Sequence, residues 1–254
     1  MKANKVSILI AILSIFGSVS NSVISADVPG VDEHTVLYLK FDEGSGKEVK
    51  ELSGNGNDGT ITGAEWVEGK FGKALEFKDD DFIEVIDSES LDIAENITIE
   101  AWVNPADDDG GYVLLKKDSY GFPKFIGGNS FQFYLNVGGQ TITDTVVGQI
   151  VVNTWQYYAA VYDGKQMRQY VNGKEVLAQP HTGGIGISGN NITIAHSFGW
   201  HQNGARNFAG KIDELRVSDI ARTVDEIKEA MNGFGNAVNA GSKFAVSWGW
   251  IKDF

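Results

Sequence analysis

Apolar residues recur at every second position through most of the chain from Thr35 onward, and this spacing constrains the fold most. Leu37, Leu39 and Phe41 lie at alternate positions. A period of two is typical of half-buried β-strands, in which neighbouring side chains point to opposite faces. Ten further short segments, rich in β-branched and aromatic residues, are read as strands: 74–77, 82–86, 97–103, 112–116, 131–137, 141–147, 155–163, 166–172, 192–196 and 211–217.

Glycine, asparagine and aspartate separate these segments, as in Asp163-Gly164 and Asn172-Gly173. These residue types supply the positive φ angles of tight turns. Ten or more strands joined in this way favour an all-β, two-sheet antiparallel sandwich over alternating strands and helices. Because no linker-like stretch interrupts the middle of the chain, a single domain over residues 27–232 is expected.

One short helix is expected near the end of this domain. Thr223 and Glu226 have the spacing of a capping box, and Gly233 provides a stop signal. Between them, Ile227, Ala230 and Met231 make one apolar face.

The first 26 residues have the order of a secretory signal peptide. Lys2 and Lys5 precede an apolar run over 6–16, and cleavage is expected near Ser25 or Ala26. A run of 11 residues is shorter than the ~20 needed to span a bilayer. A retained anchor or a buried helix stays an alternative. After cleavage no membrane span is expected, and the protein is expected outside the cytoplasm, in a bacterial periplasm, on the surface or in the medium.

The chain is acidic and has no cysteine. It contains 21 Lys and Arg against 34 Asp and Glu, a net charge of −13 that becomes −15 without residues 1–26. Nucleic acid is not an expected partner, because such binding needs clustered positive charge. Disulfides, thiolate metal sites and cysteine nucleophiles are excluded. Residues 233–254 read as a flexible linker followed by a short aromatic tail.

An ordered set of motifs resembles the laminin-G-like, or concanavalin-A-like lectin/glucanase, jelly-roll domains of secreted bacterial proteins. The set consists of LKFDEGSG (39–46), SGNGNDGT (53–60), GKALEF (72–77), DDFIEV (80–85), ITIEAWVNP (97–105), WQYYAAVYDG (155–164), YVNG (170–173), GKIDELR (210–216) and ARTVDE (221–226). The resemblance implies two curved antiparallel sheets. It also implies a module that binds carbohydrate or protein, often with a structural calcium ion. Many relatives close a cysteine pair, which this chain lacks.

No catalytic residues are predicted. Glycosidases of this fold carry carboxylates that alternate along one strand and face one cleft. The nearest candidates, Glu84 with Asp87 and Asp213 with Glu214, do not alternate in this way, because adjacent residues of a regular strand point to opposite faces. The chain is therefore not expected to be an enzyme.

A possible structural calcium site involves Asp42, Asp58 and Asp213. Calcium takes six to eight oxygen ligands, and these acids lie beside glycine turns with exposed carbonyls. In folds of the resembled type the first and last strands are neighbours, so Asp42 and Asp213 are expected to converge. Turn capping by the acids is the alternative interpretation.

The predicted ligand-binding residues lie in a glycine-containing loop between two expected strands: Trp200, His201, Asn203 and Arg206. A tryptophan beside polar side chains suits the stacking and hydrogen bonding of a sugar. Anchoring of the loop is the alternative role. Trp102 and Trp155 are expected in the packed framework. A further group is expected on a sheet face, with the side left open: Tyr112, Tyr134, Tyr158, Arg168 and Tyr170.

The function expected from the sequence is that of a secreted, non-catalytic recognition module. Extracellular or cell-envelope glycan is the first candidate partner. A protein-interaction or adhesion module on the same fold is the alternative, and a degenerate glycoside hydrolase is the third interpretation.

Overall fold

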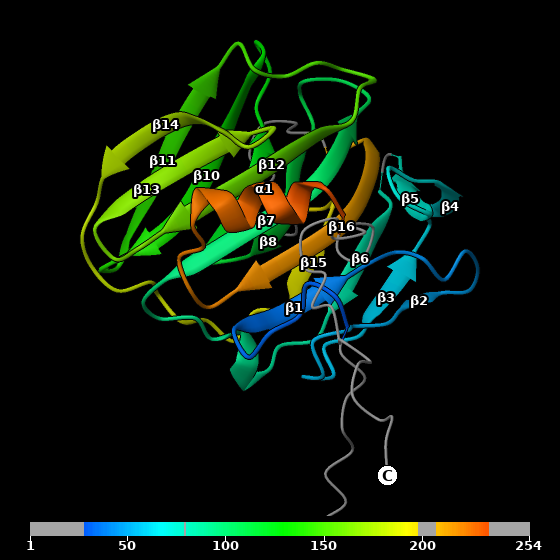
Figure 1. Ribbon diagram of the computed structural model, residues 1–254, viewed down its shortest axis with the longest axis horizontal. Helices are drawn as coiled ribbons and strands as arrows, with labels where there is room; N and C mark the ends of the chain where they lie inside the picture. The colour runs from blue at the N-terminus through cyan, green and yellow to red at the C-terminus, as the bar shows by residue number, and fades with distance from the viewer. Residues whose placement is uncertain (1–27, 79, 198–206, 234–254) are drawn as a thin grey trace, which may run out of the picture.

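The computed structural model describes residues 28–78, 80–197 and 207–233, which form two antiparallel sheets packed face to face (Figure 1). Each sheet has eight strands. The order in the first, sheet A, is β14 (Lys174–Pro180), β13 (Gln166–Val171), β12 (Gln156–Tyr162), β7 (Ile97–Pro105), β16 (Gly210–Ser218), β5 (Lys73–Phe77) and β4 (Glu65–Glu68), and β1 (Thr35–Leu39) also pairs with β16.

Sheet B lies behind sheet A in the view of Figure 1. Its strand order is β11 (Gln140–Val147), β10 (Ser130–Val137), β9 (Tyr120–Phe125), β8 (Gly111–Lys116), β15 (Ile192–Ile194), β6 (Phe82–Val85), β3 (Gly59–Thr62) and β2 (Glu48–Val49). A short 3-10 helix, η1, spans Glu89–Leu91, and one α-helix, α1, spans Val224–Met231.

The main hydrophobic core fills the space between the sheets. Sheet A contributes side chains such as Ile99 and Tyr158, and sheet B contributes Ile83, Phe122 and Phe133, all fully buried. In β6 the core side chains alternate with Phe82 and Glu84 on the outer face. The two-sheet antiparallel sandwich predicted from the period of two is confirmed.

Helix α1 covers part of the outer face of sheet A (Figure 1). Its side chains Ile227 and Ala230 are buried against Trp102, Tyr157 and Tyr170 of the sheet. The capping box of Thr223 and Glu226 is present, as predicted. Trp102 is therefore packed as expected, but beneath the helix rather than between the sheets.

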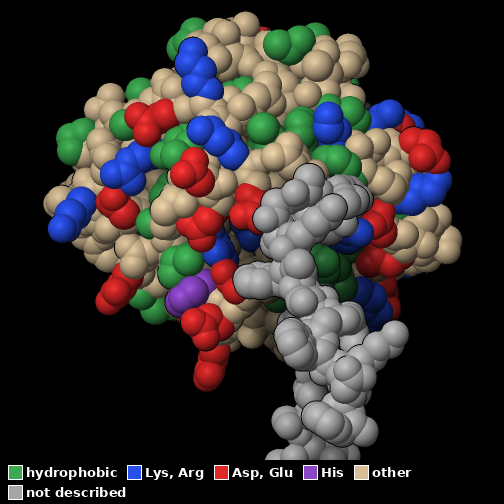
Figure 2. Space-filling model, in the orientation of Figure 1, with side chains coloured by type: hydrophobic (Ala, Val, Ile, Leu, Met, Phe, Trp, Pro, Cys, Tyr) green, Lys and Arg blue, Asp and Glu red, His purple; other side chains and the backbone are tan. Residues whose placement is uncertain are grey.

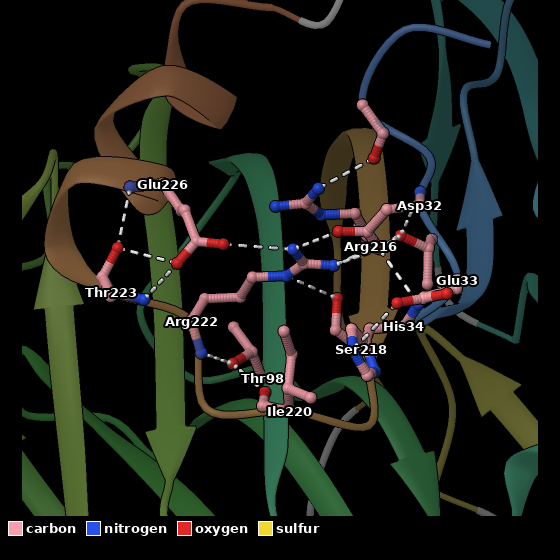
Figure 3. A network of polar contacts seen from close by, with 12 residues as sticks. Asp32, Glu33, His34, Thr98, Arg216, Ser218, Ile220, Arg222, Thr223 and Glu226 are labelled. Carbon is pink, nitrogen blue, oxygen red and sulfur yellow. Dashed lines mark hydrogen bonds and ion pairs between the residues drawn. The ribbon is translucent and has the colours of Figure 1, made fainter. Parts of the chain in front are cut away.

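A polar network joins the helix to the start of the described chain (Figure 3). The buried Arg222 guanidinium donates to both carboxylate oxygens of Asp32, each at 2.6 Å, and to Glu226 at 3.2 Å. Arg216 donates to the carbonyl of Gly30 at 2.8 Å and to Glu100. The Arg222 guanidinium beside Asp32 holds the pKa of that carboxyl well below its usual range, despite the opposing effect of burial.

Strand β16 contains a bulge that changes the direction of two acidic side chains. Asp213 pairs with Trp102 and Arg216 with Glu100, so two residues of β16 oppose one residue of β7. Within the bulge Glu214 has a φ of 53°. The expectation that Asp213 and Glu214 point to opposite faces is therefore wrong, because a bulge breaks the alternation of a regular strand.

Five strands were not expected from the sequence: β2, β3, β4, β9 and β14. Strand β9 has the sequence YGFPKF, in which Gly121 and Pro123 weaken the strand signal. The predicted signal peptide (1–26) and the predicted aromatic tail lie outside the described residues. None of the helices in the described ranges is long and apolar enough to cross a membrane.

Candidate functional site

Two of the three predicted calcium ligands come together at the turn between β4 and β5. Asp42 accepts a hydrogen bond from the amide of Lys73 at 2.9 Å and forms an ion pair with Lys40 at 2.6 Å. Asp213 accepts a hydrogen bond from the amide of Phe71 at 2.9 Å. This convergence follows from the pairing of β1 with β16, as the resemblance implied.

Asp213 is a buried acid with one unsatisfied oxygen. Its side chain is fully buried, and its Oδ1 has no hydrogen-bond partner in the described part of the chain. Burial, with smaller contributions from Glu214 and Asp42, raises the pKa of Asp213 to about 8. Burial also raises the pKa of Glu214 to about 6, against the effect of its hydrogen bond from Tyr38. A bound cation would relieve this concentration of negative charge.

The third predicted ligand, Asp58, has different partners. Its carboxylate accepts hydrogen bonds from Lys50 at 2.7 Å and from the amide of Glu51 at 2.9 Å. Across residues 28–78, 80–197 and 207–233, no group of three or more Asp, Glu or His side chains is arranged to hold a metal. Asp42 and Asp213 thus fit a cation in part, and calcium binding stays a prediction.

The predicted ligand residues Trp200, His201, Asn203 and Arg206 lie outside the described residues. The two flanks of their loop are described. Before it, the ring of His196 lies 5.6 Å from that of Phe82, on the outer face of β6. After it, Asn207 donates to Asp80 at 3.0 Å. Both flanks therefore lie next to β6, at sheet B.

The outer face of sheet B carries a row of polar, aromatic and aliphatic side chains that crosses seven strands in register. In order from β3 to β11 the row contains Thr60, Glu84, Thr193, Leu115, Gly121, Tyr134 and Thr143. Thr60 and Thr143 at the two ends of the row are exposed and Glu84 is half-buried, whereas Thr193, Leu115 and Tyr134 in its middle are 6%, 1% and 0% exposed. Glu84 and Thr193 were not among the predicted ligand residues. The period of two nevertheless places both side chains on the outer face of sheet B, because they alternate with core residues such as Ile83 and Ile194.

Aromatic side chains stabilise this outer face. The rings of Tyr112 and Tyr134 are 6.1 Å apart, edge to face, and together with Leu115 they form a small buried cluster. Lys124 lies over the Tyr112 ring at 5.2 Å. A Cβ atom at Gly121 would lie 2.9 Å from the Tyr112 ring, so glycine is required there for the ring to pack. These rings pack closely against one another and against the backbone at Gly121.

The five residues whose side was left open divide among three environments. Tyr112 and Tyr134 lie on the outer face of sheet B, and Tyr158 lies in the main core. Tyr170 packs beneath α1, and Arg168 forms an ion pair with Asp163 at 2.9 Å. Only two of the five therefore contribute to the face opposite the helix.

The outer face of sheet A differs from that of sheet B because a helix lies on it. Helix α1 covers its aromatic residues Trp102, Tyr157 and Tyr170, and Glu100 and Arg216 form a buried ion pair beside them. Figure 2 shows the same side of the molecule with charged side chains of both signs scattered around the helix. The polar groups of this side that the structure describes are used largely on one another.

Comparison with known families gives one match. A family model described as the concanavalin A-like lectin/glucanases superfamily matches residues 77–228. These residues run from the end of β5 into α1 and so include most of both sheets. No curated protein sequence matches the chain.

Several solved structures are similar in fold. The binding domain of Paraclostridial Mosquitocidal Protein 1 has a TM-score of 0.64 at 18% identity over 78% of this chain. Domain 4 of AbnA, a GH43 extracellular arabinanase from Geobacillus stearothermophilus solved with arabinotriose, has a TM-score of 0.63 at 19% identity over 77% of this chain. The binding domain of botulinum neurotoxin DC, solved with rat synaptotagmin II, has a TM-score of 0.62 at 16% identity over 79%.

The alignments cover different shares of the three solved structures. The alignment covers 97% of the arabinanase domain but 52% of each of the two toxin binding domains, so the chain spans about half the length of the latter. At these identities the likeness shows the fold alone.

Proposed function

Because the chain belongs to the concanavalin A-like lectin/glucanases superfamily, we propose that it is a non-catalytic recognition module that binds carbohydrate at the outer face of sheet B. The observation that carries this proposal is the row of side chains across that face, from Thr60 through Glu84 and Thr193 to Thr143. The exposed hydroxyl groups of Thr60 and Thr143 and the half-buried carboxylate of Glu84 suit hydrogen bonding to sugar hydroxyls. The Thr193 hydroxyl is buried and donates to the carbonyl of His196 at 2.7 Å.

The fold neighbours support a binding role. The arabinanase domain was solved with arabinotriose, and two of the toxin structures are binding domains. We propose that this chain also binds carbohydrate. We further propose that it is exported to the cell exterior. The loop that contains Trp200, His201, Asn203 and Arg206 is proposed to contribute to the same site, since both of its flanks lie beside β6.

Catalysis is disfavoured by the burial of two of the four candidate acids and by the ion pair of a third. Asp213 and Glu214 are 0% and 2% exposed, so neither reaches a substrate on the surface. Asp87 forms an ion pair with the buried Lys116. A glycosidase needs two carboxyl groups on either side of an accessible bond. The degenerate hydrolase is therefore the weakest of the three candidate functions.

A protein-binding role is the second candidate, and one observation favours it. Exposed valines gather at the end of the edge strand β11 and in the turn that follows, where Val147, Val151 and Val152 are 66%, 53% and 43% exposed. An edge strand with unpaired backbone groups is a common docking place for a partner strand. On this alternative, binding would depend on these valines and not on sheet B's outer face.

A calcium ion held by Asp42 and Asp213 is part of the proposal. It would neutralise buried negative charge next to the turn between β4 and β5. Its proposed role is structural, because Asp213 is buried and its hydrogen bond is made to the amide of Phe71.

A glycan array probed with the mature protein, residues 27–254, tests the proposed function. The expected result is selective binding to a family of related oligosaccharides. Absence of binding to every glycan, with the protein folded by circular dichroism, would leave the protein-interaction module as the better interpretation. A polysaccharide hydrolysis screen with the same sample checks the hydrolase directly.

A further inference from the structure

An open pocket of about 280 Å³ lies along the row on sheet B, where the row crosses β6, β15 and β8. Small-molecule pockets start at about 300 Å³, so this one suits a ligand the size of a monosaccharide. Its lining combines an aliphatic wall with charged, amide and hydroxyl groups: Glu84, Leu115, Lys117, Asn190, Asn191 and Thr193.

The amide groups of the pocket are held in place before any ligand arrives. Asn190 donates to the carbonyl of Lys117 at 2.9 Å, and Asn191 donates to Glu84 at 2.9 Å. The carbonyl of Asn191's side chain in turn accepts from the amide of Asp87 at 3.0 Å. Preorganised polar groups lose little conformational entropy on binding.

A buried ammonium group supports this pocket from beneath. Lys116 is fully buried, forms ion pairs with Asp87 and Asp92, and donates to the carbonyl of Asn190 at 3.1 Å. A buried lysine is rarely retained without such partners. Lys116 thus fixes the backbone of the segment that carries both asparagines.

Hydrogen-bonding capacity remains for a ligand. Asn191 bonds one carboxylate oxygen of Glu84, Oε1, which leaves Oε2 as an acceptor. Lys117 forms no ion pair within the described ranges, in contrast to its buried neighbour Lys116. A carboxylate accepts from hydroxyl groups and an ammonium group donates to hydroxyl oxygens.

The charges of the pocket point to a neutral ligand. Glu84 and Lys117 have opposite signs, so the pocket has no net preference for an anion or a cation. The whole chain carries a net charge of −13, which disfavours the approach of acidic polysaccharides. The ligand that satisfies both conditions has many hydroxyl groups and no charge.

We propose that this pocket binds one sugar unit of a neutral glycan, with Glu84 and Lys117 as its ligand-contacting residues. The inference rests on the proposed carbohydrate-binding function and names its site and ligand class. It places recognition where the row crosses β6, β15 and β8 and not at the valine-bearing edge strand.

Titration calorimetry with two variants tests the pocket. The probes are the neutral oligosaccharides arabinotriose, xylotriose, cellotriose and mannotriose, with trigalacturonate as the acidic comparison. Lys117→Ala and Glu84→Gln are each expected to raise the Kd of the bound neutral probe about tenfold or more, because each loses a charge-assisted hydrogen bond. Lys174→Ala, an exposed lysine on β14, is the matched control and is expected to bind as the wild type does.

The outcomes separate the site from the function. Equal affinity of both variants and wild type for a neutral probe would overturn the pocket while leaving carbohydrate binding intact. Failure of every neutral probe to bind the wild type overturns both. Preferential binding of trigalacturonate contradicts the neutral ligand class. Thermal midpoints within about 2 °C of the wild type exclude misfolding as the cause of lost affinity.

Discussion

Two adjacent acidic residues of β16 are buried in the folded protein, and their burial affects its stability. Asp213 and Glu214 lie at a bulge, where Glu214 has a positive φ, and both have raised pKa values, to about 8 and about 6. Burial is the largest cause for each. The charged forms of both side chains are therefore disfavoured in the folded protein relative to the unfolded chain.

This burial predicts a stability that falls as pH rises. Between about pH 4 and 8 the folded protein, kept in chelator, holds a proton on Asp213 that the unfolded chain has released. The free energy of unfolding is expected to fall through this window, by up to about 1.4 kcal/mol per pH unit for one proton. Urea unfolding at several pH values measures the slope. Asp213→Asn is expected to flatten it, and an unchanged slope in that variant would assign the effect to other groups.

Calcium is expected to act on the same carboxylate. Adding calcium at pH 8 is predicted to raise the Tm of the wild type, and chelator is predicted to reverse the rise. Asp213→Asn is expected to lose this response. Asp58→Asn is expected to keep it, because Asp58 bonds Lys50 and the amide of Glu51. An unchanged wild-type midpoint, with no calcium by elemental analysis, would rule the ion out.

Among the elements, strands with strong alternation were predicted well. Segments such as 131–137 and 211–217 match β10 and β16 closely, and the turn at Asn172-Gly173 has positive φ at both residues, 50° and 72°. Strands with glycine, proline or mixed exposure, such as β9 and β14, were missed. Their pairing with a neighbouring strand decides their conformation, and a local pattern does not contain that information.

The candidate site could be predicted only in part for a similar reason. The convergence of Asp42 and Asp213 followed from the expected neighbourhood of the first and last strands. The pocket around Lys117 and Asn190 was missed, because those residues lie outside the strand segments read from the period of two. Only the fold brings the 190–191 segment next to β8 and β6.

The capping box at the start of helix α1 is expected to stabilise the folded protein. Thr223→Ala removes the hydroxyl that accepts from the amide of Glu226, so it is expected to lower the free energy of unfolding by about 1 kcal/mol. Thr182→Ala, at an exposed position outside the helix, is the matched control and is expected to change stability little. Chemical denaturation measures both. Equal losses in the two variants would show that the cap contributes nothing specific.

Across the whole molecule the two outer faces are used differently. On sheet A, helix α1 covers the aromatic side chains of the outer face, and Arg222 pairs with Asp32 and Glu226. On sheet B, the row from Thr60 to Thr143 includes a pocket in which Glu84 and Lys117 retain hydrogen-bonding groups for a ligand. This asymmetry is the central reason to place recognition on sheet B.

Chemical-shift mapping of the ¹⁵N-labelled mature protein with a neutral oligosaccharide from the array tests that claim most directly. Perturbed amides are expected to cluster around Glu84, Thr193 and Asn190, with β7, β12 and α1 unaffected. Shifts confined to α1 and sheet A, or to the exposed valines at the end of β11, would contradict it.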